Sequence, residues 1–253
     1  MTGAPHRLYG DLASCWPLLA PPEEQAEAAG ALRTLVPAGG SLLELGSGSG
    51  ALASHLPADL EVVLVDRSPE MLAVSRQANP GRRHVQADLR ALSLGRRFDL
   101  VLLHDAVMYL VDDGDLETVL AVAAAHLAPG GRVVVVPDVV EEDFTETVLS
   151  GTGEDPATGR ACVLTEWHWD PAPGDGRSRA EMTLMMRAPG QPVCTVHESH
   201  ELLLRSRGDY WAALSAAGLR PDPSVDPIAL MPLGQPFVAR LSPKIEITGA
   251  ARG

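Results

Sequence analysis

One segment constrains the fold of this chain more than any other. The run Leu42–Leu45 leads directly into a turn that contains Gly46, Gly48 and Gly50. An apolar run, a glycine-rich turn and a following helical pattern predict a buried strand, a tight turn and a helix. Glycine has no Cβ and accepts positive φ, so the backbone amides of such a turn can approach a bound ligand closely. The segment therefore predicts the first strand and the ligand-binding turn of an α/β fold.

Short apolar runs recur after this turn. They cover residues 62–65, 84–86, 100–103 and 133–136, with helical patterns between them at 69–79 and 116–127 and an earlier one at 22–36. Runs that are apolar on both faces suit parallel strands between two layers of helices. The alternation of strand and helix predicts a doubly wound α/β sheet.

The pattern changes after Pro137. Residues 161–169, 179–187 and 193–204 interleave polar and apolar side chains, and turn-rich clusters separate them. Short turns between such strands predict antiparallel hairpins. We expect these strands to form an insert over one edge of the main sheet. A helix over 206–217 and two strands near 219–225 and 236–241 complete the predicted order.

The second strand of the predicted sheet ends in a carboxylate. Asp66 follows 20 residues after Gly46, where it can hold both hydroxyls of a ribose. Gly46, Gly48 and Ala51 also satisfy the dinucleotide fingerprint, and that fingerprint alone is weak evidence. These residues by themselves leave open a dinucleotide site and a strand–helix turn without a ligand.

Further residues separate these alternatives. Glu44 precedes the glycine turn, where a dinucleotide site usually has an apolar residue, and Asp88 follows the third strand. The fourth strand runs into His104, and the fifth follows the turn 127–131. This ordered series resembles the class I S-adenosylmethionine (SAM)-dependent methyltransferases over about residues 40–140.

The resemblance implies a fold, a cofactor and a set of binding residues. The fold is a Rossmann-like, mostly parallel seven-stranded sheet, the cofactor is SAM, and S-adenosylhomocysteine is the product. The implied cofactor-binding residues are Glu44 before the turn, Gly46, Gly48 and Gly50 around methionine, Asp66 at the ribose, Arg67 and Met71 beside adenine, Asp88 and Leu89 at the adenine edge, and His104 where methionine meets substrate.

The whole chain is similar, more loosely, to small methyltransferases of antibiotic pathways, including amino-sugar N-methyltransferases. In those enzymes an N-terminal segment with a tyrosine, matched here by Tyr9, folds over the cofactor, and an antiparallel insert covers the substrate. The resemblance implies one methyltransferase domain over 1–253. Its parts are an N-terminal helical lid (1–38), a SAM-binding half (40–140) and an antiparallel substrate-covering insert (160–205).

Two residues are candidates for the chemistry of methyl transfer. His104 ends a strand at the carboxyl edge, where doubly wound folds bind ligands, so it is a candidate base. Asp105 can orient His104 or hold a substrate amine. The alternative for His104 is a ring that only packs. Tyr109 offers a hydroxyl at the rim of the site, with packing against the next helix as its alternative.

The predicted insert contains four candidate substrate-binding residues. Strand alternation places Glu166 and His168 on one face, and Trp167 and Trp169 on the other. A polar face toward the site suits a cationic or hydrogen-bonding substrate, and a tryptophan face suits a flat or apolar one. The sequence leaves both orientations open.

No metal site is predicted. His197 and His200 lie close in sequence, but in a strand they point to opposite faces, which argues against joint ligation. A formal net charge of −13 argues against a nucleic-acid substrate. The chain has no run of about 18 apolar residues and no basic, apolar N-terminal signal, so we expect no membrane partner and a cytoplasmic location. Whether the protein is a monomer or a homodimer is left open.

These observations predict an enzyme that transfers a methyl group from SAM to a nitrogen or oxygen nucleophile of a small molecule, a secondary metabolite. One alternative is an NAD-dependent oxidoreductase, although a Tyr-x-x-x-Lys pair is absent because Lys244 is the only lysine. The other alternative is a SAM-binding protein without turnover.

Overall fold

The computed structural model describes residues 6–242, and its main sheet has seven strands in the order β10-β11-β5-β4-β1-β2-β3. The strands are β1 Ser41–Leu45, β2 Glu61–Asp66, β3 Arg83–Gln86, β4 Phe98–His104, β5 Leu127–Val136, β10 Leu219–Pro221 and β11 Phe237–Leu241. Strands β1 to β5 run parallel, and β11 is antiparallel to both β5 and β10. The predicted doubly wound, mostly parallel sheet is confirmed.

Both faces of this sheet are covered. Leu42, Leu64 and Leu100 face α2 (Ala26–Arg33) and the 3₁₀ helix η8 (Pro227–Leu233). Their neighbours on the opposite face pack with α4 (Asp115–Ala125) and α5 (Arg207–Ala216). A third helix, α3 (Pro69–Ala78), contacts β2 and β3. Burial on both faces explains why these strands are continuous apolar runs rather than alternating ones.

The order of the strands locates the site. From β1 the chain adds β2 and β3 on one side of the sheet, and it then crosses to add β4 and β5 on the other. In doubly wound sheets ligands bind outside the carboxyl ends of the strands at such a switch point. The carboxyl ends of β1 and β4 are therefore where a cofactor and its substrate are expected to meet.

Two predicted elements are shorter than expected. The helix expected after Gly50 is only the 3₁₀ helix η4 (Ala53–His55). Pro57 explains the early end, because a residue before proline avoids the helical region, and Leu56 is extended at φ −77° and ψ 141°. The strand expected at 219–225 ends at Pro221.

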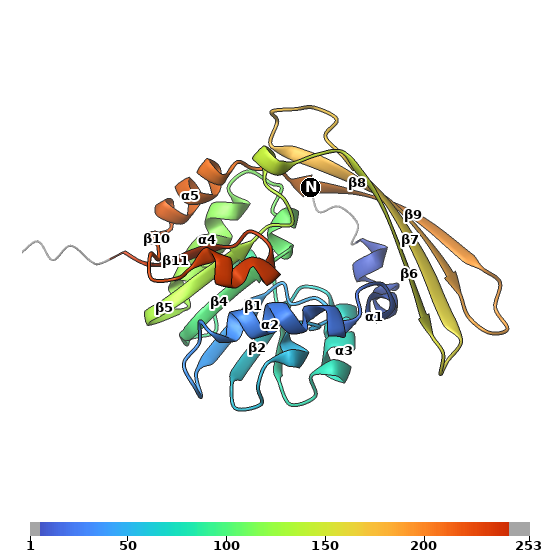
Figure 1. Ribbon diagram of the computed structural model, residues 1–253, viewed down its shortest axis with the longest axis horizontal. Helices are drawn as coiled ribbons and strands as arrows, with labels where there is room; N and C mark the ends of the chain where they lie inside the picture. The colour runs from blue at the N-terminus through green and yellow to red at the C-terminus, as the bar shows by residue number, and fades with distance from the viewer. Residues whose placement is uncertain (1–5, 243–253) are drawn as a thin grey trace, which may run out of the picture.

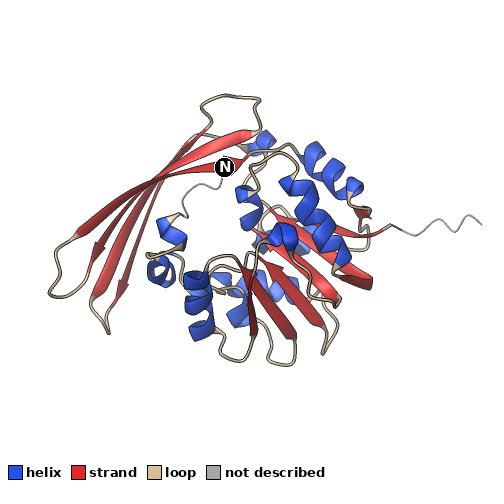
Figure 2. Ribbon diagram, turned by 180° about the vertical axis from the view of Figure 1, so that it is seen from behind, coloured by secondary structure: helices blue, strands red, loops and turns tan. Residues whose placement is uncertain are grey.

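A second, antiparallel sheet lies between β5 and α5 in the chain; we call it the insert sheet. It contains β6 (Thr147–Asp155), β7 (Arg160–Trp169), β8 (Arg177–Arg187) and β9 (Cys194–Leu203) in that order. Figures 1 and 2 show it as a long, twisted sheet beside the main fold. The predicted insert began at residue 160 and therefore lacked β6.

The missed strand has a composition that resembles a loop. β6 contains Gly151 and Gly153, and glycine weakens a strand pattern. Gly153 has a packing reason, because a Cβ there would lie 1.9 Å from the Leu18 carbonyl oxygen. Helix α1 (Trp16–Leu19) packs against β6 and β7, so the close approach of its backbone requires this glycine.

The predicted N-terminal lid divides into two parts. The 3₁₀ helices η1 (Arg7–Tyr9) and η2 (Ala13–Cys15) and helix α1 lie between the main sheet and the insert sheet (Figure 1). The 3₁₀ helix η3 (Pro22–Gln25) then leads into α2, which belongs to the core of the main sheet. Of the described residues in the predicted lid, only those from Arg7 to Leu19 therefore lie where a lid is expected; residues 1–5 lie outside the described part of the chain.

The remaining 3₁₀ helices are η5 (Leu89–Ala91), η6 (Ala106–Tyr109) and η7 (Glu141–Asp143). No helix within residues 6–242 is long and apolar enough to cross a membrane. All three cysteines are free: Cys15 and Cys162 are buried and Cys194 is exposed.

Candidate active site

The glycine turn after β1 is held against the end of β2. The amides of Gly46 and Ser47 both donate to the Val65 carbonyl oxygen, at 2.8 and 2.9 Å. Gly46 has φ +74°, and a Cβ there would lie 2.2 Å from Ala106 Cβ. Any side chain at this position would collide with η6, so glycine is required for the turn to reach the start of the site.

Asp66 organises the next part of the turn. Its Oδ2 accepts from the Gly48 amide at 2.9 Å and its Oδ1 from the Ser68 amide at 2.8 Å. The Ser68 hydroxyl caps α3 by accepting from the Met71 amide, and it lies 2.5 Å from the Tyr9 carbonyl oxygen, to which it donates. The structure thus brings Tyr9, Asp66 and Met71 together around the glycine turn, as the cofactor assignment requires.

Glu44 is buried behind this turn with 4% of its surface exposed. Burial, together with the negative charges of Asp105 and Asp66, raises the pKa of Glu44 to about 8. Its Oε2 is buried and has no hydrogen-bond partner within residues 6–242. A buried carboxyl with a free oxygen beside a glycine cradle fits the charged amino group of the methionine part of SAM.

The predicted adenine-binding residues lie at the edge of the turn. Leu89 is near Gly46, since its Cδ1 is 3.8 Å from the position of a Gly46 Cβ. Asp88 caps η5 and binds the Arg90 guanidinium at 2.6 Å, which lowers the pKa of Asp88. Arg67 is exposed. The side chain of Asp88 is therefore held by Arg90, which leaves its role at adenine a prediction.

Three titratable side chains meet where β4 and β5 end. His104 Nε2 lies 3.1 Å from Asp105 Oδ1, and Asp138 follows β5 and interacts with Asp105. Burial lowers the pKa of His104, with partial compensation by Asp138. Burial and the Asp105 charge raise the pKa of Asp138 well above its ordinary value. The cluster therefore favours a neutral imidazole and a proton shared between the two aspartates.

Asp105 has an unusual backbone. It is the one non-glycine residue with positive φ (53°) in the described part of the chain. Such conformations cost free energy and concentrate at functional sites. Burial raises the pKa of Asp105, and the hydrogen bond with Asp138 opposes that rise. The side chain nevertheless keeps 56% of its surface exposed, so solvent moderates the rise and a substrate can reach the carboxylate.

The insert sheet contributes Glu166 to this cluster. Burial and the Asp138 charge raise the pKa of Glu166, so the two carboxyls act on each other electrostatically. His168 lies on the same face, but its Nε2 is 2.9 Å from the Ser178 hydroxyl and its ring packs edge-on against Phe144. Glu166 is therefore the member of this pair that is available to a substrate.

The two tryptophans lie on the outer face of the insert sheet. Trp167 is 51% exposed and donates to Glu146 Oε1 at 2.8 Å. Trp169 contacts it, with ring centroids 5.5 Å apart. The polar face of β7 is thus the one turned toward the site, and the expectation that Trp167 and Trp169 bind substrate is not supported by their position.

Tyr9 and Tyr109 meet beside the carboxyl cluster. Their hydroxyl oxygens are 2.6 Å apart, and the Tyr109 hydroxyl is 2.9 Å from His200 Nδ1. Burial raises the pKa of both tyrosines, and the charges of Asp138 and Glu166 add to this rise. The hydroxyls therefore lie in the field of the carboxyl cluster.

His200 and Asp138 are the functional candidates that the sequence analysis missed. Asp138 follows β5 at its carboxyl end, so the argument that selected His104 would also have selected it. His197 is 64% exposed and pairs with Glu181, whereas His200 is fully buried, which confirms that the two point to opposite faces.

A different histidine meets His200. Atoms of His6, Glu198 and His200 that are able to bind a metal lie within 4.8 Å of one another. Both Glu198 oxygens, however, accept backbone amides, from Arg7 at 2.5 Å and Leu8 at 2.9 Å. These hydrogen bonds account for both Glu198 oxygens, and they clamp η1 to β9.

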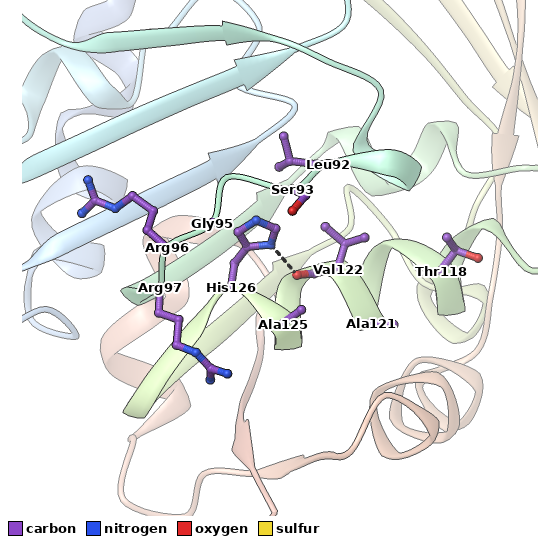
Figure 3. Close-up of a pocket in the computed structure, with 10 residues that line it drawn as sticks. All are labelled: Leu92, Ser93, Gly95, Arg96, Arg97, Thr118, Ala121, Val122, Ala125 and His126. Carbon is purple, nitrogen blue, oxygen red and sulfur yellow. Dashed lines mark hydrogen bonds between the residues drawn. The ribbon is translucent and has the colours of Figure 1, made fainter.

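A separate hollow of about 560 Å³ lies at the amino-terminal end of β4 (Figure 3). It is lined by Arg96, Arg97 and His126, among others. Arg96 is paired with Glu61, Arg97 donates to the Leu127 carbonyl oxygen, and His126 bonds to Val122 and Leu94. Its polar groups are engaged by the protein itself, and it is at the opposite edge of the sheet from the carboxyl cluster.

Comparison with known proteins agrees with this geometry. Residues 42–131 match the family model described as a methyltransferase domain. The chain is 33% identical over 199 residues to dTDP-3-amino-3,6-dideoxy-alpha-D-glucopyranose N,N-dimethyltransferase of Streptomyces fradiae, covering 78% of this chain and 76% of that relative. The chain belongs to the SAM-dependent methyltransferases.

Solved structures place it more narrowly. The crystal structure of Streptomyces venezuelae DesVI has a TM-score of 0.77 at 27% identity and covers 95% of this chain and 100% of that one. SAM-bound CalS10, an amino pentose methyltransferase from Micromonospora echinaspora, has a TM-score of 0.66 at 26% identity and covers 87% and 91%. The chain is thus similar to an amino pentose methyltransferase over 87% of its length.

These findings establish the general activity. The enzyme uses SAM as its cofactor and transfers a methyl group to a nitrogen or oxygen nucleophile of a small molecule. The alternative of an NAD-dependent oxidoreductase is wrong, because residues 42–131, which contain the glycine turn, match a methyltransferase domain.

Proposed function

We propose that the enzyme methylates the amino group of an amino sugar in natural-product biosynthesis. The carboxyl cluster formed by Asp105, Asp138 and Glu166 carries the proposal, because negative and hydrogen-bond-accepting groups suit an amine. The relatives that act on amino sugars support the same substrate class.

The cluster supplies what an amine needs from its enzyme. Bound SAM supplies an activated methyl group on a sulfonium. The neutral amine nitrogen forms the new N–C bond as the methyl carbon leaves the sulfonium sulfur, which keeps the electron pair of the broken bond. The nitrogen then carries an extra proton, and an ionised carboxylate of the cluster accepts it. In this proposal Asp105 holds the amine, and neutral His104 fixes the direction of the Asp105 carboxylate.

Substrate comparison tests the proposal directly. The enzyme is incubated with SAM and dTDP-3-amino-3,6-dideoxy-α-D-glucose, or with the matched sugar that has a hydroxyl at the same carbon. Product mass and S-adenosylhomocysteine release are measured. We expect methylation of the amine alone. Equal turnover of the hydroxyl sugar, or turnover of neither sugar, would contradict the proposal, and the free amino sugar shows whether the nucleotide is needed.

A variant separates the acid cluster from the cofactor site. Asp105→Asn is expected to raise KM for the amine about tenfold, because the carboxylate proposed to hold the amine is replaced by a neutral amide, with S-adenosylhomocysteine affinity unchanged within about twofold. Asp59→Asn, an exposed position on the opposite edge, is the matched control. An unchanged KM in Asp105→Asn would remove the cluster from substrate binding.

The remaining expectations concern partners and location. A small-molecule substrate without nucleic-acid or membrane partners is supported by the net charge of −13 and by the carboxyl-rich site. A cytoplasmic location is supported by the three free cysteines, which suit a reducing compartment.

A further inference from the structure

Three hydrogen-bonding side chains from distant parts of the chain form a continuous line. The hydroxyl of Tyr9, in η1, is 2.6 Å from that of Tyr109, in η6. The Tyr109 hydroxyl is in turn 2.9 Å from Nδ1 of His200, on β9. The line therefore connects the N-terminal segment, the main fold and the insert sheet, whose arrangement Figure 1 shows.

His200, at one end of the line, determines which group donates in each hydrogen bond. His200 is fully buried, and its Nε2 lies 3.6 Å from Glu198 Oε2 with no hydrogen-bond partner among residues 6–242. An ionised carboxylate only accepts, so the nearby negative charge favours the imidazole proton on Nε2. Nδ1 is then an acceptor, and Tyr109 donates to it.

Each tyrosine hydroxyl has one proton to donate, so the tautomer of His200 determines the direction of both hydrogen bonds in the line. Since Tyr109 donates to His200, its oxygen accepts from Tyr9. Tyr9 then has no proton left for the site, and its remaining lone pair is a hydrogen-bond acceptor. The opposite tautomer of His200 would reverse every bond and make Tyr9 a donor.

The Tyr9 hydroxyl bonds to Tyr109, which lies in η6, the short helix whose N-cap is Asp105 of the carboxyl cluster. The charges of Asp138, Asp105 and Glu166 all act on the Tyr9 hydroxyl. Hydrogen bonds hold the backbone of the N-terminal segment that carries Tyr9. The Ser68 hydroxyl donates to the Tyr9 carbonyl oxygen, and the Glu198 carboxylate accepts from the Arg7 and Leu8 amides. A fixed acceptor near three carboxyls suits an N–H group.

We propose that His200 is a positioning residue for methyl transfer: through Tyr109 it makes the Tyr9 hydroxyl oxygen an acceptor for an N–H of the substrate, which orients the amine lone pair toward the methyl group. The inference rests on the proposed amine substrate. It concerns the geometry of the transfer step and assigns no proton transfer to His200.

Kinetics of three variants test the inference. His200→Leu removes the acceptor for Tyr109 and is expected to lower kcat for the amine about tenfold, with S-adenosylhomocysteine affinity unchanged within about twofold. His200→Asn keeps a side-chain acceptor close to the Nδ1 position and is expected to recover kcat to within about threefold of the parent enzyme. His197→Leu is the matched control, because His197 is exposed on the opposite face.

A double variant distinguishes positioning from damage to the fold. Tyr109→Phe interrupts the same line, so adding it to His200→Leu is expected to lower kcat no further than either single change. Multiplied losses, failure of His200→Asn to recover kcat, or an equal loss in His197→Leu would overturn the inference. Melting temperatures identify any variant that loses kcat by unfolding.

Nitrogen-15 NMR of the histidines gives a readout that needs no substrate. We expect the Nε2–H tautomer of His200 in the parent enzyme, and an Nδ1–H tautomer would overturn the inference. If the parent enzyme methylates no amine, the proposed function fails, whereas the tautomer still decides the direction of the hydrogen bonds.

Discussion

The SAM-binding half and the insert sheet bury their strands differently. β1 and β4 are buried on both faces, with Leu42, Leu43, Leu100 and Val101 all inaccessible to solvent. In β7 of the insert sheet, Cys162 is 2% exposed while Trp167 on the other face is 51% exposed. A strand buried on both faces leaves few residues free to vary, and a strand with one open face leaves many.

The difference extends to function. The groups assigned to the cofactor are backbone amides, glycines and one carboxylate, all positioned by local turns. The groups assigned to the substrate depend on the insert sheet, which carries Glu166 on its polar face and the buried His200, linked to Tyr9 through Tyr109. Changes in the SAM-binding half should therefore affect folding and cofactor binding, and changes in the insert sheet should affect the substrate alone.

The largest expected effect is on stability in the SAM-binding half. A Cβ at Gly50, which has φ +71°, would lie 2.2 Å from Ser75 Oγ and 2.6 Å from Asn79 Nδ2. Gly50→Ala should lower the free energy of unfolding by about 3 kcal/mol, because strain and overpacking act together. Denaturant titration measures this. Gly30→Ala, in α2 with open space around it, is the control and should raise stability by about 0.5–1 kcal/mol. Equal effects of the two changes would contradict the argument.

The next effect is on cofactor binding. Asp66→Ala removes the acceptor of the Gly48 and Ser68 amides together with the predicted ribose partner. We expect Kd for S-adenosylhomocysteine to rise about 100-fold in calorimetric titration. Asp66→Asn keeps the shape of the side chain, so its Kd for S-adenosylhomocysteine should lie between those of the parent enzyme and Asp66→Ala. Binding that survives in Asp66→Ala would remove this carboxylate from the cofactor site.

A smaller effect depends on pH. Burial raises the pKa of Glu44 to about 8 in the folded protein without cofactor, above its value in the unfolded chain. The folded state therefore binds more protons between these two pKa values, and this residue lowers stability by up to about 1.4 kcal/mol per pH unit across that interval. Glu44→Gln should remove that decline in thermal melts of the cofactor-free protein, most clearly near pH 8. If the melting temperatures of the parent and Glu44→Gln changed with pH in parallel, Glu44 would ionise with an ordinary pKa.

The smallest effect belongs to the open face of the insert sheet. Trp167→Ala removes an aromatic side chain on the face away from the site, so kcat and KM for the amine should stay within about twofold of the parent. A larger change in KM would show that the outer face takes part in substrate binding, and would weaken the contrast between the two sheets.

The sequence predicted the SAM-binding half well because its signals are local. The nine residues Leu42–Gly50 predict both a strand and a turn, and Asp66 ends the next apolar run. The fold class follows from such short segments, because apolar periodicity and glycine conformation act over a few residues, and the cofactor follows from the family resemblance that these segments carry. The strand β6 was missed for a related reason. Gly153 is required because the backbone of Leu18, 135 positions away in sequence, packs closely against it, and a local sequence pattern carries no information about so distant a contact.

The sequence by itself determined that this chain is a doubly wound α/β protein with a glycine turn after its first strand and a carboxylate at the end of its second strand. Only the tertiary structure decided which face of β7 meets the site, that Asp138 joins Asp105, and that Tyr9, Tyr109 and His200 form one line. The physical reason is that these contacts join residues far apart in the chain: the two hydrogen bonds of the line span 100 and 91 positions. Their distances depend on how the two sheets pack together, and that packing is a property of the whole folded chain.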